Sequence, residues 1–160
     1  MKNKLIEILL LFIILAALQL TLINFITIEN IGPQLLVIFV LYYSLKLKNS
    51  HSLLFGFFTG LLFDLISGGI TGVNAFAFTF VSFIANKSKH KFEGNIFPTN
   101  YFVWLVFVSS SVASFFINFF YGNSNNFLEA VLLYGIISGI YTTLFALPLI
   151  LFLKGRNPNG

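Results

Sequence analysis

Cysteine is absent from this chain of 160 residues, and charged residues make up only 9% of it. The absence of cysteine excludes disulfides, thiolate metal sites and cysteine nucleophiles. Soluble domains carry about 25% charged residues, whereas this chain combines 58% hydrophobic residues with a mean hydropathy of +0.93. The composition therefore predicts an integral membrane protein whose surface meets lipid.

Groups for catalysis are also scarce. Aspartate occurs once, at Asp64, whereas an intramembrane aspartyl protease needs two facing aspartates. His51 and His90 lie at predicted membrane boundaries, so no embedded histidine is available to activate a serine. No G-x-x-x-x-G-K-[ST] loop is present to hold a phosphate. We predict that the protein is not an enzyme and has no cofactor and no metal site.

The first apolar run predicts an uncleaved membrane span. Lys2 and Lys4 precede a run that continues to about Phe25. A signal peptide has an apolar region of about 7–15 residues and a cleavage site of the A-x-A type, and neither feature is found here.

The nine basic residues fall into four clusters that divide the chain into three apolar blocks. If every cluster faces the cytoplasm, each block crosses the membrane and returns. The net charge of +4 then reflects topology, and no nucleic-acid partner is expected. This predicts an all-α bundle of about six transmembrane helices in one domain, residues 1–160, with both termini cytoplasmic. The clusters are Lys2/Lys4, Lys46/Lys48, Lys87/Lys89/Lys91 and Lys154/Arg156. The predicted spans are approximately 5–26, 33–48, 51–66, 73–87, 99–121 and 127–153.

Two details of these spans are notable. Pro33 is expected to open the second helix, where its missing N–H group is not needed. The spans 51–66 and 73–87 would rise only about 24 Å, less than the hydrocarbon thickness of about 30 Å. A re-entrant hairpin would keep the flanking lysines on one side equally well, but we favour a hairpin that crosses.

Small residues recur at every fourth position around Asp64, and a second G-x-x-x-G pattern follows later in the chain. Such spacing lets two helices approach closely. We favour packing within the chain over packing against a partner's transmembrane helix. The candidate helix-packing or partner-binding residues are Gly56, Gly60, Asp64, Gly68, Gly72, Asn74, Gly135 and Gly139.

Asp64 has three interpretations. Its carboxylate can accept N–H groups of the Gly68–Gly72 turn or bond Asn74, it can form a proton or cation site, or it can anchor a partner's polar group. We favour the first, because no second intramembrane acid is available to relay a proton.

The remaining polar groups have simpler predicted roles. Gln19, Asn24 and Asn118 are each expected to bond a neighbouring helix. The run Lys87, Lys89 and Lys91 is expected to meet anionic lipid headgroups, with docking of a cytoplasmic protein as the alternative.

The segment Gly56-Phe-Phe-Thr-Gly60-Leu-Leu-Phe-Asp64-Leu, followed by Ser67-Gly68, Gly72 and Asn74-Ala75, resembles the signature of the MreD family of bacterial rod-shape-determining membrane proteins. The chain length and the Pro33 helix start are also similar. The resemblance implies a noncatalytic scaffold of the cell-elongation (rod) complex, which builds lateral-wall peptidoglycan in the bacterial inner membrane.

The resemblance also implies partners and a fold. The partners are MreC and, through it, the MreB filament and the RodA–penicillin-binding-protein synthase. The fold is similar to that of the substrate-binding subunits of energy-coupling-factor transporters. The alternative function is therefore a small-solute binding subunit of such a transporter. It is less favoured because the first helix has only the adjacent pair Ala16 and Ala17 in place of an A-x-x-x-A face.

Overall fold

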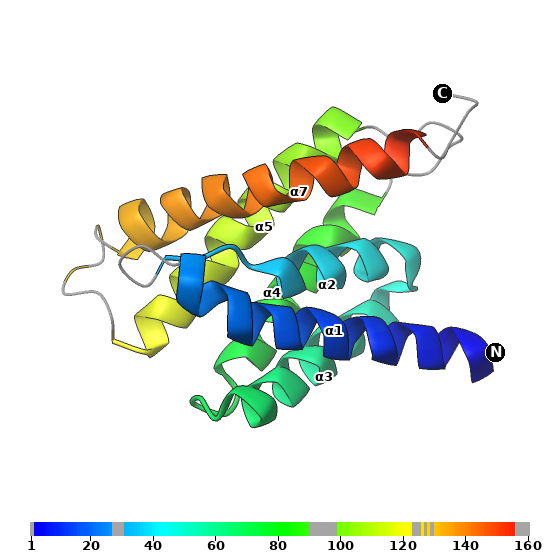
Figure 1. Cartoon of the computed structure of the whole chain (residues 1–160), viewed down its shortest axis with the longest axis horizontal. Helices are drawn as coiled ribbons and strands as arrows, with labels where there is room; N and C mark the ends of the chain where they lie inside the picture. The colour runs from blue at the N-terminus through cyan, green and yellow to red at the C-terminus, as the bar shows by residue number, and fades with distance from the viewer. Residues whose placement is uncertain are drawn as a thin grey trace.

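The structure is a computed structural model that describes residues 2–26, 31–89, 99–122, 126, 128 and 130–155. Every element in this part is helical, and η2 is a π-helix that runs directly into α7 (Figure 1). The prediction of an all-helical fold with six consecutive helical segments is confirmed for the described residues. The elements are α1 (Lys2–Ile26), α2 (Leu35–Lys46), α3 (Asn49–Ser67), α4 (Val73–Ser88), α5 (Thr99–Phe120), η2 (Ala130–Ile137) and α7 (Ser138–Gly155).

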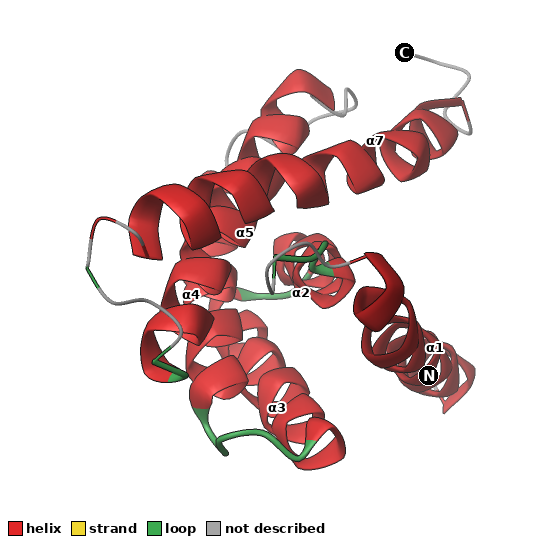
Figure 2. Ribbon diagram, turned by 60° about the vertical axis from the view of Figure 1, so that its left-hand side comes forward, coloured by secondary structure: helices red, strands yellow, loops and turns green. Residues whose placement is uncertain are grey.

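Helix α2 lies at the centre and contacts α1, α3, α4, α5 and α7 (Figure 2). All of its residues from Leu36 to Leu41 are buried, as expected for a helix that is apolar all round. Its 12 residues span about 18 Å, which is less than the hydrocarbon thickness of about 30 Å. The core of the molecule is therefore built around a helix that is too short to cross a bilayer alone.

The start of α2 differs from the prediction, because the helix begins at Leu35 and Pro33 lies in the non-helical segment before it. Side chains of other helices satisfy this buried backbone. The Gln34 N–H donates to Thr142 Oγ1 (3.0 Å), the Leu36 N–H donates to Gln19 Oε1 (2.9 Å), and Ser138 Oγ donates to the Gly32 carbonyl (3.4 Å). Non-helical backbone at membrane depth is tolerated where protein groups satisfy it in this way.

Two pairs of helices flank α2. Helix α3 packs along α4, and α5 packs against η2 and α7 (Figures 1 and 2). Contacts between α4 and α5 join the two pairs. Helix α1 is peripheral and packs mainly on α2, where Phe12 and Phe39 have ring centroids 6.4 Å apart. The α3–α4 pair and the α5–α7 pair therefore form the two main packing units of the bundle.

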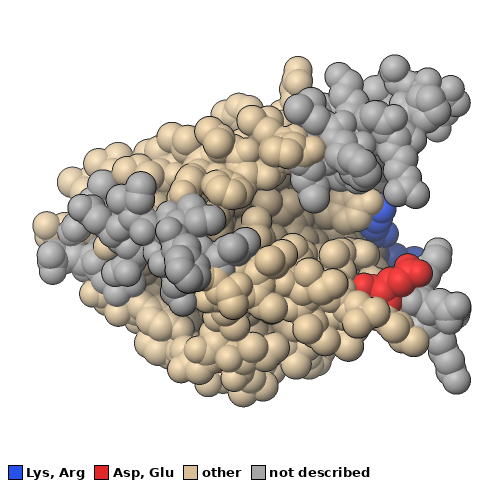
Figure 3. Space-filling view, viewed as in Figure 1, with Lys and Arg blue, Asp and Glu red and all other residues tan. Residues whose placement is uncertain are grey.

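The outer surface is largely apolar. Large exposed hydrophobic side chains occur on α1, α3, α4, α5, η2 and α7, and on the face shown in Figure 3 the described charges gather at one end. Among the described residues, two helical stretches are long and apolar enough to cross a membrane, Asn49–Ser67 and Asn100–Phe120. Ile6–Thr21, Leu35–Lys46 and Tyr134–Pro148 are shorter apolar helices. An apolar surface of this extent is typical of contact with a membrane.

Candidate functional site: the α3–α4 hairpin

Asp64 lies in the last turn of α3, and only 1% of its surface is exposed. Its carboxylate accepts four hydrogen bonds from the start of α4. Oδ2 accepts from the backbone N–H groups of Gly72 (2.8 Å) and Ala75 (3.2 Å). Oδ1 accepts from the backbone N–H group (3.2 Å) and from Nδ2 (2.8 Å) of Asn74. This is the geometry of the first of the three interpretations of Asp64.

The position of these donors explains why an acid is placed here. The first N–H groups of a helix have no intrahelical partner, and Gly72, the N-cap of α4, has no side chain to satisfy them. Asp64 therefore supplies from α3 the oxygens that an N-cap side chain normally supplies. Its negative charge also lies at the positive end of the α4 dipole. The four donors offset the cost of burying the carboxylate.

Gly56 and Gly60 bring α3 against the backbone of α4. A Cβ atom on Gly60 would lie 2.5 Å from the Cα of Ala75 and still closer to the carbonyl oxygen of Asn74. A Cβ atom on Gly56 would lie 2.5 Å from the carbonyl oxygen of Phe78. No other residue fits at these positions unless the helices separate. The first G-x-x-x-G pattern is therefore covered by this chain's own α4.

Gly68 and Gly72 belong to the turn rather than to the helical stripe. Helix α3 ends at Ser67, and Gly68 follows as a left-handed C-cap with φ of 67°, which favours glycine because it lacks Cβ. Gly72 has φ of 102°. The expected stripe of every fourth residue thus ends with the helix, and only Gly56, Gly60 and Asp64 lie on α3.

Tyr121 joins the hairpin to the end of α5. Its hydroxyl accepts a hydrogen bond from the Ile70 N–H group (2.9 Å) and lies directly against Gly69, where a Cβ atom would meet the same oxygen. The sequence analysis missed this contact. The only signals available were a tyrosine at a helix end and a turn with a glycine pair, and the bonded residues Ile70 and Tyr121 lie 51 residues apart in the sequence.

The second G-x-x-x-G pattern is divided between two kinds of helix. Gly135 is buried in the π-helix η2, and Gly139 is buried at the start of α7. Because a π-helix forms i→i+5 hydrogen bonds, the two glycines do not follow the α-helical spacing assumed from the sequence. A Cβ atom on Gly139 would meet the Ser111 hydroxyl and would lie 3.1 Å from the Phe107 ring.

Buried hydroxyl pairs were also missed by the sequence analysis. Ser44 and Ser82 join α2 to α4, with their Oγ atoms 2.8 Å apart. Ser114 and Ser138 join α5 to α7, with their Oγ atoms 2.6 Å apart. A serine within an apolar helix is the only sequence signal, and it does not identify the partner.

The polar residues that were singled out have mixed outcomes. The prediction that Gln19 bonds a neighbouring helix is confirmed by its contact with Leu36. Asn118 Nδ2 donates to the Ser114 carbonyl of its own helix (3.0 Å) and has a further interaction. The side chain of Asn24 lies outside the described residues.

Lysines at the ends of the helices have different environments. Lys89 Nζ donates to the Leu47 carbonyl and to Asn49 Oδ1, and thus ties the end of α4 to the α2–α3 connection. Burial lowers the pKa of Lys89, because desolvation disfavours its charged form. Lys87 is exposed, with Nζ 5.7 Å from the centre of the Phe83 ring. Lys91 and His90 lie outside the described residues.

The arrangement is built for contact between helices. All four donors to the Asp64 carboxylate belong to Gly72, Asn74 and Ala75 of the same hairpin. Among the described residues, no group of three His, Asp or Glu side chains could hold a metal ion.

The fold and the site define a class: a small helical bundle with an apolar outer surface and a glycine-rich hairpin closed by one buried acid. A family model described as rod shape-determining protein MreD matches residues 2–156. No curated protein and no solved structure matched the chain.

The chain belongs to the MreD family, and the resemblance stated from the signature segment is confirmed. It is therefore a membrane protein with a role in rod shape determination. The family is a structural component of the shape-determining machinery and is not known as an enzyme.

Proposed function

We propose that this chain is a noncatalytic membrane scaffold of the bacterial cell-elongation (rod) complex in the inner membrane. It helps determine cell shape and lateral peptidoglycan synthesis through contacts with an MreC-like protein. Through that protein it is linked to the MreB filament and to the RodA–penicillin-binding-protein synthase. The observation that carries the proposal is the Asp64 contact, in which the chain's only aspartate is used entirely to join two helices.

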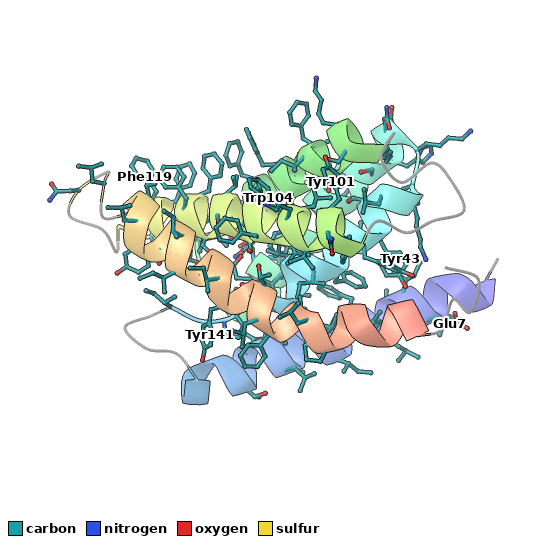
Figure 4. The ribbon with its side chains drawn as sticks, turned by 90° about the horizontal axis from the view of Figure 1, so that it is seen from above. Glu7, Tyr43, Tyr101, Trp104, Phe119 and Tyr141 are labelled. Carbon is teal, nitrogen blue, oxygen red and sulfur yellow. The ribbon has the colours of Figure 1, made fainter. Side chains whose placement is uncertain are left out.

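The arrangement of the helix ends fits a topology of six membrane crossings with both termini in the cytoplasm, which we adopt over a re-entrant α3–α4 hairpin that would place the same ends together. Lys89 contacts the α2–α3 connection, and the Tyr101 hydroxyl at the start of α5 bonds Ser88 at the end of α4 (3.4 Å). Figure 4 shows Glu7, Tyr43 and Tyr101 toward one end of the bundle and Phe119 at the other. The two central basic clusters thus share one end, as the positive-inside rule requires.

In this function the hairpin residues hold the shape of the scaffold. Gly56, Gly60 and Asp64 are covered by α4, which favours helix packing over direct partner contact for this stripe. The partner then meets other surfaces of a bundle whose shape the hairpin sets. Anionic headgroups are expected at Lys87, which is exposed, more than at Lys89, whose amine is engaged by the protein.

Co-purification from detergent extracts tests the proposal. The wild-type chain should retain an MreC-like protein, whereas Gly60→Leu should lose most of it, because the added side chain forces α3 away from α4. Ala17→Leu is the matched control, since Ala17 is exposed on α1 and its substitution adds bulk without a clash. A wild-type chain that retains no such protein, or a depleted strain that keeps normal shape and wall insertion, would contradict the proposal.

A further inference from the structure

The start of α3 differs from the starts of α2 and α4. Gln19 accepts from a backbone N–H group at the start of α2, and Asp64 accepts from those at the start of α4. Helix α3 follows Lys48, whose side chain can only donate, and its first turn carries no acid. In the described part of the chain, no group accepts from the N–H groups of residues 49–51. The positive end of this helix dipole is therefore uncapped.

A second cation lies against the same turn. Lys89, at the end of α4, donates to Asn49 Oδ1 (3.1 Å) and to the Leu47 carbonyl. Both acceptors are neutral, and burial lowers the pKa of Lys89 because desolvation disfavours its charged form. The contact with Leu47 caps the end of α2, but it also brings a positive charge to the positive end of α3. Among the described residues, no carboxylate compensates this charge.

A buried hydroxyl faces the same place. Ser52 has no exposed surface, and its Oγ has no hydrogen-bond partner. It lies one turn before Gly56, on the face of α3 that meets Ser82 of α4. Because side chains lean toward the N-terminus of their helix, the hydroxyl points toward the end where Asn49 and Lys89 meet. A buried donor without an acceptor indicates a group that binds there.

Asn86 distinguishes a peptide from a simple anion. Its Nδ2 donates to the Asn49 carbonyl (3.0 Å), which places the side chain beside the first turn of α3. Its Oδ1 is buried and has no partner, so this atom needs a donor. A phosphate or a free carboxylate would leave it unpaired. A peptide segment with an acidic side chain offers both a carboxylate for the donors and an N–H group for Asn86.

The other lysines at this end have a different environment. Lys46 Nζ lies 4.0 Å from the centre of the Tyr42 ring, and Lys87 Nζ lies 5.7 Å from the centre of the Phe83 ring. Both rings lie one turn back toward the membrane, and the positive-inside rule accounts for these two lysines. The N–H groups at the start of α3 instead point along the helix axis, out of the bundle. A ligand of these groups therefore arrives from beyond the membrane surface rather than from the lipid beside the bundle.

We propose that the start of α3 and the end of α4 bind an acidic segment of a cytoplasmic protein. A carboxylate of the segment accepts from the α3 N–H groups, the Ser52 hydroxyl and the amines of Lys48 and Lys89, and an N–H group of the segment donates to Asn86 Oδ1. The inference rests on the proposed function only in placing this end in the cytoplasm. It gives the inner end of the hairpin a partner, whereas Asp64 closes the outer end.

The placement is tested first, and separately from the MreC-like protein. The chain has no cysteine, and Ser50 is exposed in the first turn of α3. A membrane-impermeant maleimide should label Ser50→Cys in inside-out vesicles and leave it unlabelled in intact spheroplasts. Labelling in spheroplasts would overturn a cytoplasmic source, whatever the co-purification of the MreC-like protein shows.

Binding is then measured on the full chain in nanodiscs of phosphatidylcholine. The probe is a fluorescein-labelled peptide of alternating aspartate and glycine, followed by fluorescence anisotropy. Lys48→Gln should weaken binding about tenfold, the usual effect of losing a charge-assisted contact. Lys87→Gln is the matched control and should change it by about twofold or less. Ser52→Ala should weaken binding about fivefold, whereas Ser109→Ala, which removes an equally buried and unpartnered hydroxyl from α5, should not.

Four results would overturn the inference. They are no binding by the wild-type chain, equal losses from Lys48→Gln and Lys87→Gln, unchanged binding by Ser52→Ala, and full displacement of the peptide by inorganic phosphate or by phosphatidylglycerol in the nanodisc. Equal losses would indicate diffuse attraction to a basic surface, and full displacement would indicate a site for a phosphate group alone. Thermal unfolding checks that the variants fold. Because Lys48 is exposed, its variant decides the question if Ser52→Ala does not fold.

Discussion

The α3–α4 pair and the α5–α7 pair each carry a G-x-x-x-G pattern, yet they use glycine against different atoms. In α3–α4 the space next to Gly60 is filled by the backbone of Asn74 and Ala75. In α5–α7 the space next to Gly139 is filled by the side chains of Ser111 and Phe107. A backbone can yield only if the whole helix moves, whereas a side chain can change rotamer. The same motif therefore marks a rigid contact in one pair and an adjustable contact in the other.

The ends of the two pairs differ as well. A carboxylate from α3 closes the start of α4, which adds a charge at the end of a helix dipole. The α5–α7 pair is joined by the neutral hydroxyls of Ser114 and Ser138. Helix α7 continues from the π-helix η2 instead of beginning at a capped N-terminus. The hairpin thus combines steric fit with a charge-assisted cap, whereas the second pair is joined by neutral hydroxyls and side-chain contacts.

The largest expected effect comes from placing leucine in both pairs. Gly60→Leu should lower the free energy of unfolding by about 3 kcal/mol, the upper end of the usual range for overpacking, because the side chain meets backbone atoms. Gly139→Leu should cost less, since Ser111 and Phe107 can move. Thermal unfolding of the two variants in the same detergent measures the difference, with Ala17→Leu as the control for added bulk on an exposed face. Equal losses at Gly60 and Gly139 would show that the two contacts are equally rigid.

The contrast also shows what the sequence could predict. Long apolar runs between clusters of basic residues predicted an all-helical fold, because both are local properties of the sequence. The Gly68 turn and the Asp64–Asn74 pairing were accessible for the same reason, since their residues lie within one hairpin. A stripe of small residues shows which face of α3 is close-packed. It does not show which helix packs there, because that depends on the whole topology.

The features that were missed depend on distant parts of the chain. Tyr121 meets Ile70 across 51 residues, and the Thr142 hydroxyl meets the Gln34 backbone across 108 residues. The second contact lies directly before α2, which begins at Leu35. In the non-helical segment before Leu35, side chains of α7 bond the Gln34 N–H group and the Gly32 carbonyl, and no local pattern around Pro33 predicts these contacts.

The second prediction removes the charge from the cap. Asp64→Asn should lower the free energy of unfolding by about 1–2 kcal/mol, because an amide keeps the shape but turns one N–H group toward the donors of α4. Hydrogen exchange should rise at Gly72 and Ala75, whose N–H groups lose their carboxylate partner. Glu7→Gln removes an exposed acid on α1 and should leave both measurements unchanged. A loss from Asp64→Asn greater than that from Gly60→Leu would mean that charge, rather than steric fit, dominates the hairpin.

The third prediction concerns rescue. Gly139→Ala should cost about 1 kcal/mol, and adding Ser111→Ala should restore most of it, because the hydroxyl is the closest obstacle and the Phe107 ring remains 3.1 Å away. Gly56→Ala should not be rescued by Ser82→Ala, because the Phe78 carbonyl would still lie 2.5 Å from the new Cβ atom. A double-mutant cycle on unfolding free energies measures both couplings. Rescue at Gly56 would contradict the view that the α3–α4 contact is set by backbone.

The smallest expected effects come from the hydroxyl pairs. Ser114→Ala and Ser44→Ala should each lower the free energy of unfolding by about 0.5–1 kcal/mol, the usual range for one hydrogen bond between membrane helices. In Ser114→Ala, the Ser138 hydroxyl can still donate to the Gly32 carbonyl. In Ser44→Ala, the Ser82 hydroxyl loses its partner at the close α3–α4 contact, beside Gly56. We therefore expect Ser44→Ala to cost slightly more, as measured by thermal unfolding against wild type. The reverse order would show that the α5–α7 pair depends on its hydroxyls because it has no backbone-to-backbone contact of the kind that Gly60 provides.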